Sequence, residues 1–348
     1  MTSIILALFI SILGIINLLG IQPYYGYRQA FFLLLGIIVY FTAKRFNLLI
    51  RQLLPVLFWL AFFLNMFLLF FGEEIKGAKR WITLGFFNLQ PSEFLIIIYM
   101  FYLSLLFSKE DLELKPIVYF IKGLGLTVIS FVVIFLQPDF TTATNLIPIF
   151  IAVLFFSNIP KKIIAGMFIL AAIALPVLWS SLKDYQKNRV LHFITSFTET
   201  EENNSATSYN STQAEIALGS GRFLGKGIGR STQSKLFFLP EAHTDFAFAS
   251  FVEQTGLAGG LLVIILYLLL IFNLIYSIFK TRNLRLLSEY IGLTHLSLAI
   301  YLSYRVVINI AMNLNLFPIA GIPLPLFSYG GSAFIALLLS FGLLELKE

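Results

Sequence analysis

Apolar runs of about twenty residues recur along almost the whole chain, and they constrain its fold more than any other feature. Of the 348 residues, 58% are hydrophobic and only 12% are charged, about half the charged share of a soluble domain. One globular core cannot bury so many runs of this length. A bilayer accepts them as helices, because a helix satisfies its own backbone polar groups. The sequence therefore predicts an all-α polytopic membrane protein.

Hydropathy places about ten transmembrane helices in the chain. A Pro/Gly/aromatic turn at 22–27 is expected to separate the first two, and the run at 246–279 is long enough to be tilted or to protrude. The first run lacks a preceding basic segment and a small-residue cleavage site, so we expect a retained helix and not a removed signal peptide. The ten ranges are 4–21, 30–41, 55–71, 94–107, 117–136, 141–156, 163–182, 246–279, 290–314 and 333–344.

The charges between these runs orient the chain weakly. Counted over short loops alone, Lys and Arg favour a cytoplasmic N-terminus, because long loops carry little weight in the positive-inside rule. Both termini are then cytoplasmic. We expect a single domain, 1–348, with 183–245 as a large extracytoplasmic loop between helices 7 and 8. This loop is too long for a bare connector, so we expect it to be functional.

Composition also argues against several kinds of site. The chain has no Cys, which excludes disulfides, Cys-ligated zinc and Fe–S clusters, and its three His residues are scattered. The net charge of +6 comes from loop Lys and Arg. No basic patch is interleaved with aromatic residues in the way that single-stranded nucleic acid requires. We expect no nucleic-acid partner and no resident metal, and we expect membrane lipid around the protein.

The segment Leu236–Phe246, LFFLPEAHTDF, concentrates ionisable side chains in an otherwise hydrocarbon-rich sequence. Glu241, His243 and Asp245 lie at a Pro-bent entry to an apolar run, where acid/base chemistry at a membrane surface would need them. The alternative is a polar loop that caps the next helix, with Thr244 or Asp245 as N-cap. From these residues alone, both interpretations stay open.

Four polar segments fall on the same side of the membrane in this topology: 77–93, 137–142, 183–245 and 317–331. Polar loops that converge on one face favour a single site there. The five glycines between 219 and 229 look like a phosphate cradle, but no strand precedes them. We expect them to allow close packing of a re-entrant segment instead.

The motifs in these segments resemble one family. GAKRWITLG, QPSE, QPD, YQKNRV, LPEAHTDF and PLPLFSYGGS occur in the order found in the SEDS family (shape, elongation, division and sporulation), typified by RodA and FtsW. The resemblance covers essentially the whole chain. TQSKLFFLPEAHTDF and FPIAGIPLPLFSYGGS look closer to RodA than to FtsW.

This resemblance implies a bacterial inner-membrane peptidoglycan glycosyltransferase that polymerises lipid II in cell elongation, cell shape or division. Lipid II, the undecaprenyl-pyrophosphate disaccharide-pentapeptide, would be both donor and acceptor. The implied partner is a class B penicillin-binding protein, a transpeptidase with one span. The family's essential aspartate lies in the HTD string, so the resemblance assigns that role to Asp245. A carboxylate beside the acceptor hydroxyl can take its proton as the bond forms.

The leaving pyrophosphate needs positive charge. Lys79, Arg80 and Arg189 are candidates for this role, although Lys79 and Arg80 would serve equally well as charges at lipid headgroups. A divalent cation, Mg²⁺ or Mn²⁺, is a further option, but the sequence shows no dedicated ligand set. The other substrate-binding candidates are Gln213, Glu241, His243 and Ser328; for Glu241 and His243 the simpler role is to orient the loop.

One departure from the family pattern concerns charge inside the membrane. The family usually has Lys three residues after the glutamate of QPSE, but here Ile96 follows Glu93 at that spacing. A lone buried carboxylate is costly, so Glu93 needs another cation. We predict that Arg305, midway along the ninth run, pairs with Glu93 and joins the fourth and ninth spans. Glu253 is the rival partner for Arg305.

Two other functions compete with polymerisation. A flippase or transporter for the same lipid-linked precursor would suit a chain with intramembrane charges and Pro/Gly-broken segments. A carrier, however, requires its polar residues near the bilayer midplane, whereas here they gather on one face of the membrane. A scaffold that merely activates a transpeptidase is the third possibility, and it requires Asp245 to be dispensable.

Overall fold

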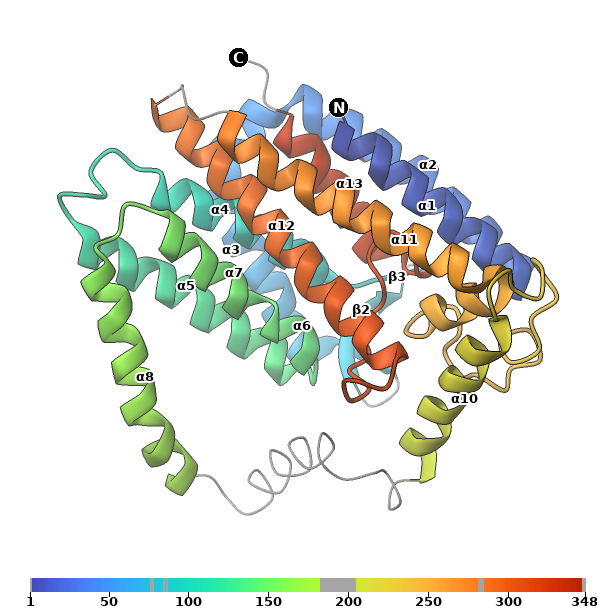
Figure 1. Ribbon diagram of the computed structural model, residues 1–348. Helices are drawn as coiled ribbons and strands as arrows, with labels where there is room; N and C mark the ends of the chain where they lie inside the picture. The colour runs from blue at the N-terminus through green and yellow to red at the C-terminus, as the bar shows by residue number, and fades with distance from the viewer. Residues whose placement is uncertain are drawn as a thin grey trace.

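Helices dominate the computed structural model, which describes residues 2–75, 78–83, 85, 87–181, 205–280 and 285–345 (Figure 1). Three short strands follow α3. The helices are α1 (Thr2–Ile21), α2 (Pro23–Arg45), α3 (Asn47–Phe71), α4 (Pro91–Phe107), α5 (Pro116–Leu136), α6 (Phe140–Thr144), α7 (Leu146–Phe156), α8 (Lys161–Ser181), α10 (Ser205–Gly221), α11 (Ala247–Lys280), α12 (Arg285–Asn313) and α13 (Gly331–Leu344). The strands are β1 (Glu73–Ile75), β2 (Ala78–Thr83) and β3 (Asn88–Leu89).

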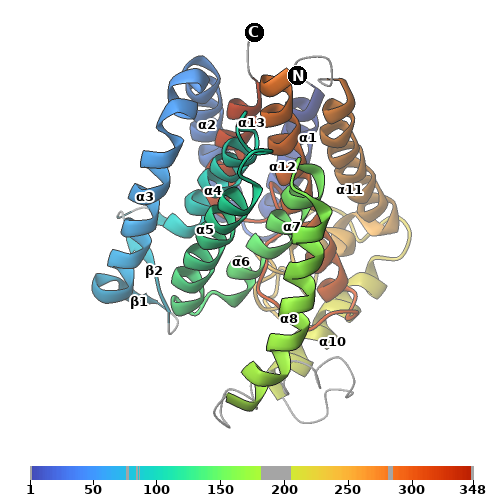
Figure 2. The ribbon, with the colours of Figure 1, turned by 90° about the vertical axis from the view of Figure 1, so that its left-hand side faces the viewer.

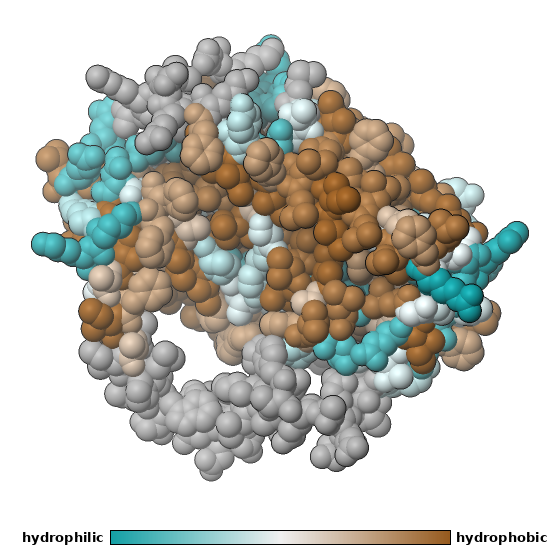
Figure 3. Space-filling view, viewed as in Figure 1, coloured by the Kyte–Doolittle hydropathy of each residue, from teal (hydrophilic) through white to brown (hydrophobic). Residues whose placement is uncertain are grey.

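The expectation of a helical polytopic membrane protein is confirmed. Within the described residues, six helices are long and apolar enough to cross a membrane: α1, α2, α3, α5, α11 and α12. Apolar helices at 91–107, 140–156 and 331–344 are shorter. Figure 3 shows a broad apolar surface over the helices, with hydrophilic residues gathered toward its edges. The count of ten spans stays a prediction.

The polar segment after α3 is not a plain loop, because it contains a three-stranded antiparallel sheet in the order β1-β2-β3. Ile82 pairs with Leu89 and Thr83 with Asn88. Aromatic and β-branched residues in β2, such as Trp81 and Ile82, favour this strand. These short strands are a local addition to the helical fold, which the sequence did not predict.

Proline fixes where three helices begin. Pro23, Pro91 and Pro116 occupy the first turns of α2, α4 and α5. Proline suits this position because its φ is already helical and its missing N–H would have had no intrahelical partner. The expected turn at 22–27 is therefore wrong: α2 starts at Pro23, directly after α1.

The long run at 246–279 is broken and not simply tilted. Gly256 has φ 76° and ψ −175°, a conformation outside the helical region that divides α11 into 247–255 and 257–280. At 1.5 Å per residue, the second part is about 36 Å long and can cross a bilayer by itself. The first part, 247–255, is not needed to cross the bilayer, and it closely follows Asp245 in the chain.

Two ends of the helical bundle can be distinguished by the segments that lie there (Figure 2). The start of α1 and the end of α13 lie together at one end, which we call the terminal end. The sheet, α6, α10 and the connection before α13 lie at the other, which we call the loop end (residues 72–75, 78–83, 85, 87–90, 137–145, 205–246 and 314–330). The described parts of the four polar segments thus converge, as the sequence predicts.

Candidate active site at the loop end

Asp245 lies in a tight turn that leads into α11. The amides of Thr244 and Phe246 both donate to the Glu241 carbonyl, at 3.0 and 3.2 Å. The Thr244 hydroxyl donates to Glu241 Oε2 at 2.9 Å. His243 Nε2 is 3.9 Å from that same carboxylate oxygen. Glu241 therefore interacts within the loop, in line with the simpler role expected for it.

Two buried asparagines of α12 hold the backbone of this turn. Asn309 and Asn313 each donate from Nδ2 to the Asp245 carbonyl, at 2.9 and 3.0 Å. Asn313 Oδ1 also accepts from the Ala249 amide at 2.9 Å, so α12 caps the first turn of α11. Both asparagines are fully buried, whereas Asp245 stays partly exposed. The sequence interpretation missed them, although their spacing of four places them on one helix face.

The connection before α13 also forms hydrogen bonds to the turn that contains Asp245. Ser328 donates from its hydroxyl to the Thr244 carbonyl at 2.6 Å and accepts from the Leu324 amide at 2.9 Å. The Tyr329 amide donates to the His243 carbonyl at 2.8 Å. Asn309 Nδ2 reaches this connection too, at the Ile322 carbonyl (2.7 Å). Ser328 is buried, and its hydroxyl joins two loops here.

An aromatic cluster borders His243, and the sequence interpretation did not identify it. The rings of Tyr25 and His243 stack at 4.1 Å with an interplanar angle of 7°. Tyr329 lies 5.0 Å from Tyr25, and the Arg28 guanidinium lies over the rings of both Tyr329 and Tyr24. Burial raises the pKa of Tyr329, and nearby Arg28 offsets part of this effect. The run YYGYR at 24–28 was the available signal.

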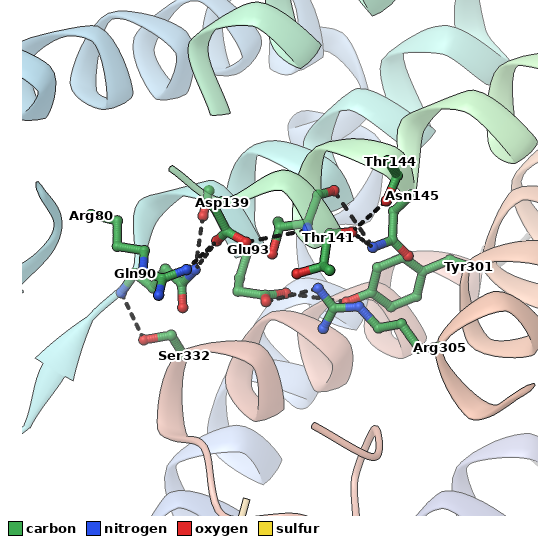
Figure 4. Close-up of polar contacts among 12 residues, drawn as sticks. Arg80, Gln90, Glu93, Asp139, Thr141, Thr144, Asn145, Tyr301, Arg305 and Ser332 are labelled. Atoms are coloured by element: carbon green, nitrogen blue, oxygen red, sulfur yellow. Dashed lines mark hydrogen bonds and ion pairs between the residues drawn. The ribbon is translucent and has the colours of Figure 1, made fainter. Parts of the chain in front are cut away.

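A second polar group joins three segments that are distant in sequence (Figure 4). Asp139 is buried, and its Oδ2 lies 3.3 Å from Arg80 Nη1 and accepts from Gln90 Nε2 at 2.9 Å. Its Oδ1 accepts from the Thr142 amide at 3.2 Å and so caps α6. The Ser332 hydroxyl accepts from the backbone N–H of Gln90 at 2.9 Å. Arg80 is thus the partner of a buried carboxylate, which neither sequence interpretation anticipated.

Glu93 and Arg305 form the predicted pair (Figure 4). Arg305 Nη2 donates to Glu93 Oε1 at 2.8 Å, and the Tyr301 hydroxyl donates to Oε2 at 3.2 Å. Glu93 is 4% exposed and Arg305 is 2% exposed. The pair joins α4 to α12. Because Arg305 lies one helical turn before Asn309, the face of α12 that holds the Asp245 turn also carries the ion pair.

Glu253 is not the partner of Arg305, so the rival pairing is wrong. Its carboxylate is fully buried and lies 2.8 Å from Lys226 Nζ. It also accepts from the amides of Thr232, Gln233 and Ser234, at 2.7 to 3.1 Å. Glu253 therefore holds the segment 226–234 against α11.

Three candidates remain, and one of them lies outside the described residues. Lys79 precedes Arg80 on β2, and Gln213 lies on α10; both are partly exposed at the loop end. Arg189 lies in 182–204, outside the described residues. Within the ranges that the structure describes, no three His, Asp or Glu side chains cluster closely enough to hold a metal ion.

Known proteins resemble this chain along nearly its whole length. Residues 2–346 match the profile of the FtsW/RodA/SpoVE family, described as cell cycle proteins. The peptidoglycan glycosyltransferase MrdB of Helicobacter pylori is 34% identical over 83% of this chain and 74% of the relative. For MrdB of Escherichia coli the identity is 35%, over 78% and 71%. The probable peptidoglycan glycosyltransferase FtsW of Nitrosococcus halophilus is 34% identical, over 91% and 80%.

Two solved structures share the fold. A chain from a peptidoglycan synthase complex that coordinates polymerisation and crosslinking superposes with a TM-score of 0.79 at 27% identity, covering 99% of this chain and 95% of that one. The crystal structure of the Thermus thermophilus rod shape determining protein RodA superposes with a TM-score of 0.68 at 25% identity, covering 99% and 94%.

Proposed function

This chain belongs to the FtsW/RodA/SpoVE family of cell cycle proteins and is a peptidoglycan glycosyltransferase, and we propose that it polymerises lipid II at the loop end with Asp245 as general base. The observation that carries this site is the way Asp245 is held. Two elements fix its turn: the connection before α13, through Ser328, and α12, through the side-chain amides of Asn309 and Asn313. A rigid backbone beneath a partly exposed carboxylate suits proton transfer, which depends on placing the base within hydrogen-bond reach.

The reaction joins two lipid-linked sugars. The acceptor's 4-hydroxyl oxygen forms a bond to the donor's anomeric carbon, and the bond from that carbon to undecaprenyl pyrophosphate breaks. The hydroxyl proton passes to the Asp245 carboxylate. A base positioned in this way typically speeds the reaction by about 10²–10⁴-fold. The pyrophosphate leaves with the electron pair of the broken bond.

Positive charge for the pyrophosphate comes, in this proposal, from exposed cations at the loop end. Lys79 is partly exposed and lies beside Arg80, which forms an ion pair with Asp139. Arg28 lies in the aromatic cluster next to His243 and offers a guanidinium suited to bidentate phosphate contact. Arg189 stays a candidate from the sequence. We propose that a divalent cation, Mg²⁺ or Mn²⁺, would arrive with the pyrophosphate, since the described residues offer no cluster of ligands for a resident ion.

We propose a class B penicillin-binding protein as the partner that crosslinks the strands. The likeness to a chain of a peptidoglycan synthase complex supports this. The decisive experiment is polymerisation of labelled lipid II by the purified chain, with and without that transpeptidase. We expect glycan strands in both cases and longer or faster synthesis with the partner. Absence of any polymer in both reactions would contradict the proposal.

The transporter alternative has less support from the geometry. A carrier needs an accessible ion or substrate site near the midplane. The intramembrane charges Glu93 and Arg305 are instead buried and neutralise each other, with Tyr301 as a third member. Of the candidate site residues, Lys79, His243 and Asp245 are partly exposed, and all three lie at the loop end.

Asn309→Leu is expected to slow polymerisation roughly ten- to a hundredfold, because the Asp245 turn loses one of its anchors. It should also cost about 1–3 kcal/mol of stability, since the buried Ile322 carbonyl and the part-buried Asp245 carbonyl each lose a donor. Lipid II turnover and thermal unfolding of the purified variant measure the two effects. Asn273→Leu, the same substitution at the terminal end, serves as the control and should keep wild-type turnover. Wild-type turnover in Asn309→Leu would show that this amide does not position Asp245.

The loop end is expected to face the cell-wall side, with both termini in the cytoplasm. Because the chain has no native Cys, single-Cys labelling of intact cells tests this directly. Cys at Thr212, an exposed position on α10, should react with an impermeant maleimide. Cys at Leu114, 82% exposed in the turn between α4 and α5, should react only after permeabilisation. The reverse pattern would invert the topology.

A further inference from the structure

One loop at the loop end exposes apolar and basic side chains together. It is the basic apolar loop, residues 222–238, which follows α10 and leads to the Asp245 turn (yellow to gold in Figure 1). The sequence of this loop contains four Lys or Arg and no Asp or Glu. Six of its large apolar side chains are at least half exposed: Phe223, Leu224, Ile228, Leu236, Phe237 and Phe238.

The loop fills the break in α11. Beyond the break, the amides of Leu257 and Ala258 donate to the carbonyls of Arg222 and Phe223, at 2.8 and 3.2 Å. Before it, the Glu253 and Gln254 carbonyls accept from the amides at 226 and 227, at 3.0 and 2.9 Å. Groups that a continuous helix would have paired internally are therefore satisfied by the loop. This arrangement fixes the loop at the level of Gly256.

Glycine makes this approach possible. Gly225 has φ +78°, and a Cβ there would lie 2.2 Å from the Gln254 carbonyl oxygen. Gly256 has φ +76°, and a Cβ there would lie 2.3 Å from the Phe223 carbonyl oxygen. The two backbones are thus in direct contact at positive φ, which a larger residue would not allow. The sequence expectation of close packing by these glycines is confirmed at Gly225, whereas Gly219 has open space around it.

From helix length we place the edge of the membrane-spanning region at the level of Gly256. Residues 257–280 form the part of α11 that can cross the bilayer, so Leu257 lies at its boundary. Gln254 links the loop to the end of α1: its Oε1 accepts from the Gly229 amide, and its Nε2 donates to Asn17 Oδ1 at 2.7 Å. Asn17 lies in the last turn or so of α1. The loop therefore packs beside the ends of two spanning helices.

The exposed apolar side chains of the loop continue the surface that α11 turns to lipid. Leu257, Leu261 and Leu262 on α11 are each about half exposed, and the Leu257 amide donates to the Arg222 carbonyl at the start of the loop. The exposed apolar side chains of Phe223 and Leu224 therefore lie close in space to the exposed leucines at the start of this part of α11. Phe237 is 65% exposed at φ 61°, a conformation that bulky residues seldom adopt.

We propose that the basic apolar loop docks into the bilayer leaflet at the loop end and binds anionic lipid there. Its apolar side chains enter the boundary of the acyl chains, where aromatic residues are favoured. The exposed Arg222, Arg230 and Lys235 reach the phosphate headgroups, which attract basic residues near a membrane surface. Lys226 is already paired with Glu253 and secures the loop to α11. Lipid thereby fixes the segment that enters the Asp245 turn.

The depth of the loop in the bilayer tests this proposal. Single Cys variants at Leu224 and Phe237, labelled with an environment-sensitive fluorophore, are reconstituted in phosphatidylcholine vesicles that contain lipids with a nitroxide on the acyl chain. The control is Thr212→Cys, an exposed position on the neighbouring α10. We expect several times more quenching at Leu224 and Phe237 than at Thr212. Equal quenching at all three positions would overturn the proposal.

A second experiment tests whether the loop prefers anionic lipid headgroups. Adding phosphatidylglycerol to the vesicles should increase quenching at Leu224, and the Arg222→Gln/Arg230→Gln double variant should lose this increase while keeping the quenching seen in phosphatidylcholine. An increase that survives in the double variant would overturn the assignment of these arginines to lipid phosphate. If both labels stay in water with lipid but become shielded when the transpeptidase is added, the occupant is a protein and the lipid proposal is wrong.

Discussion

Asp245→Asn is expected to abolish glycan-strand formation while leaving the chain folded. Asn keeps the size of the side chain and its hydrogen bonds, but it cannot accept a proton at neutral pH. The turn should survive, because Asn309 and Asn313 hold the carbonyl of residue 245 and not its side chain. The expected loss is at least the 10²–10⁴-fold, or about 3–5 kcal/mol in barrier, that a positioned base supplies.

Lipid II polymerisation by purified protein in proteoliposomes measures this effect, and thermal unfolding establishes that the variant is folded. Asp111→Asn is a matched control, since Asp111 lies in the turn between α4 and α5 at the terminal end. It should polymerise like the wild type. Near-normal polymer from a folded Asp245→Asn variant would refute the assignment of the base and would revive the scaffold alternative.

Arg305→Leu is expected to cost about 3–5 kcal/mol of stability, because it leaves Glu93 buried without its cation. Tyr301 would still donate to Glu93, but a neutral hydroxyl does not balance a carboxylate in the membrane interior. Tyr301→Phe is the matched control: it removes one hydrogen bond, keeps the ion pair and should cost only about 0.5–1.5 kcal/mol.

A double-mutant cycle with Glu93→Gln and Arg305→Leu measures the coupling between the two side chains. We expect the double variant to be more stable than the sum of the single effects predicts, because neither charge is then left alone. Ile96→Lys should also rescue Arg305→Leu in part, since residue 96 lies one helical turn from Glu93 and can supply a local cation. Simple additivity, together with no rescue, would mean that the observed contact contributes nothing to stability.

The sequence by itself determined the features that depend on local chemistry. Long apolar runs require helices in a bilayer, so the polytopic fold followed from hydropathy alone. Glu93 lies at the edge of such a run without its usual lysine, and the cost of a lone charge there required a partner. Arg305 was identified because few cations lie inside a span. The polar strings predicted convergence at one end, since alternate connections of a helical bundle share a side.

Only the tertiary structure decided which of these groups touch. Glu253 was as plausible a partner for Arg305 as Glu93. Because the 226–234 segment packs against α11, Glu253 pairs with Lys226 instead. Asn309 and Asn313 could not be recognised as supports of Asp245, because their partner is a backbone carbonyl more than sixty residues away.

The break in α11 shows the physical reason for this limit. A single glycine in an apolar run costs little and is common in membrane helices, so Gly256 carried no signal in the sequence. The helix breaks there because the backbone of a distant loop satisfies the freed amides and carbonyls. Hydropathy depends on each residue and its neighbours, whereas such a break depends on which segment is close enough to form those bonds, and the three-dimensional packing alone determines that.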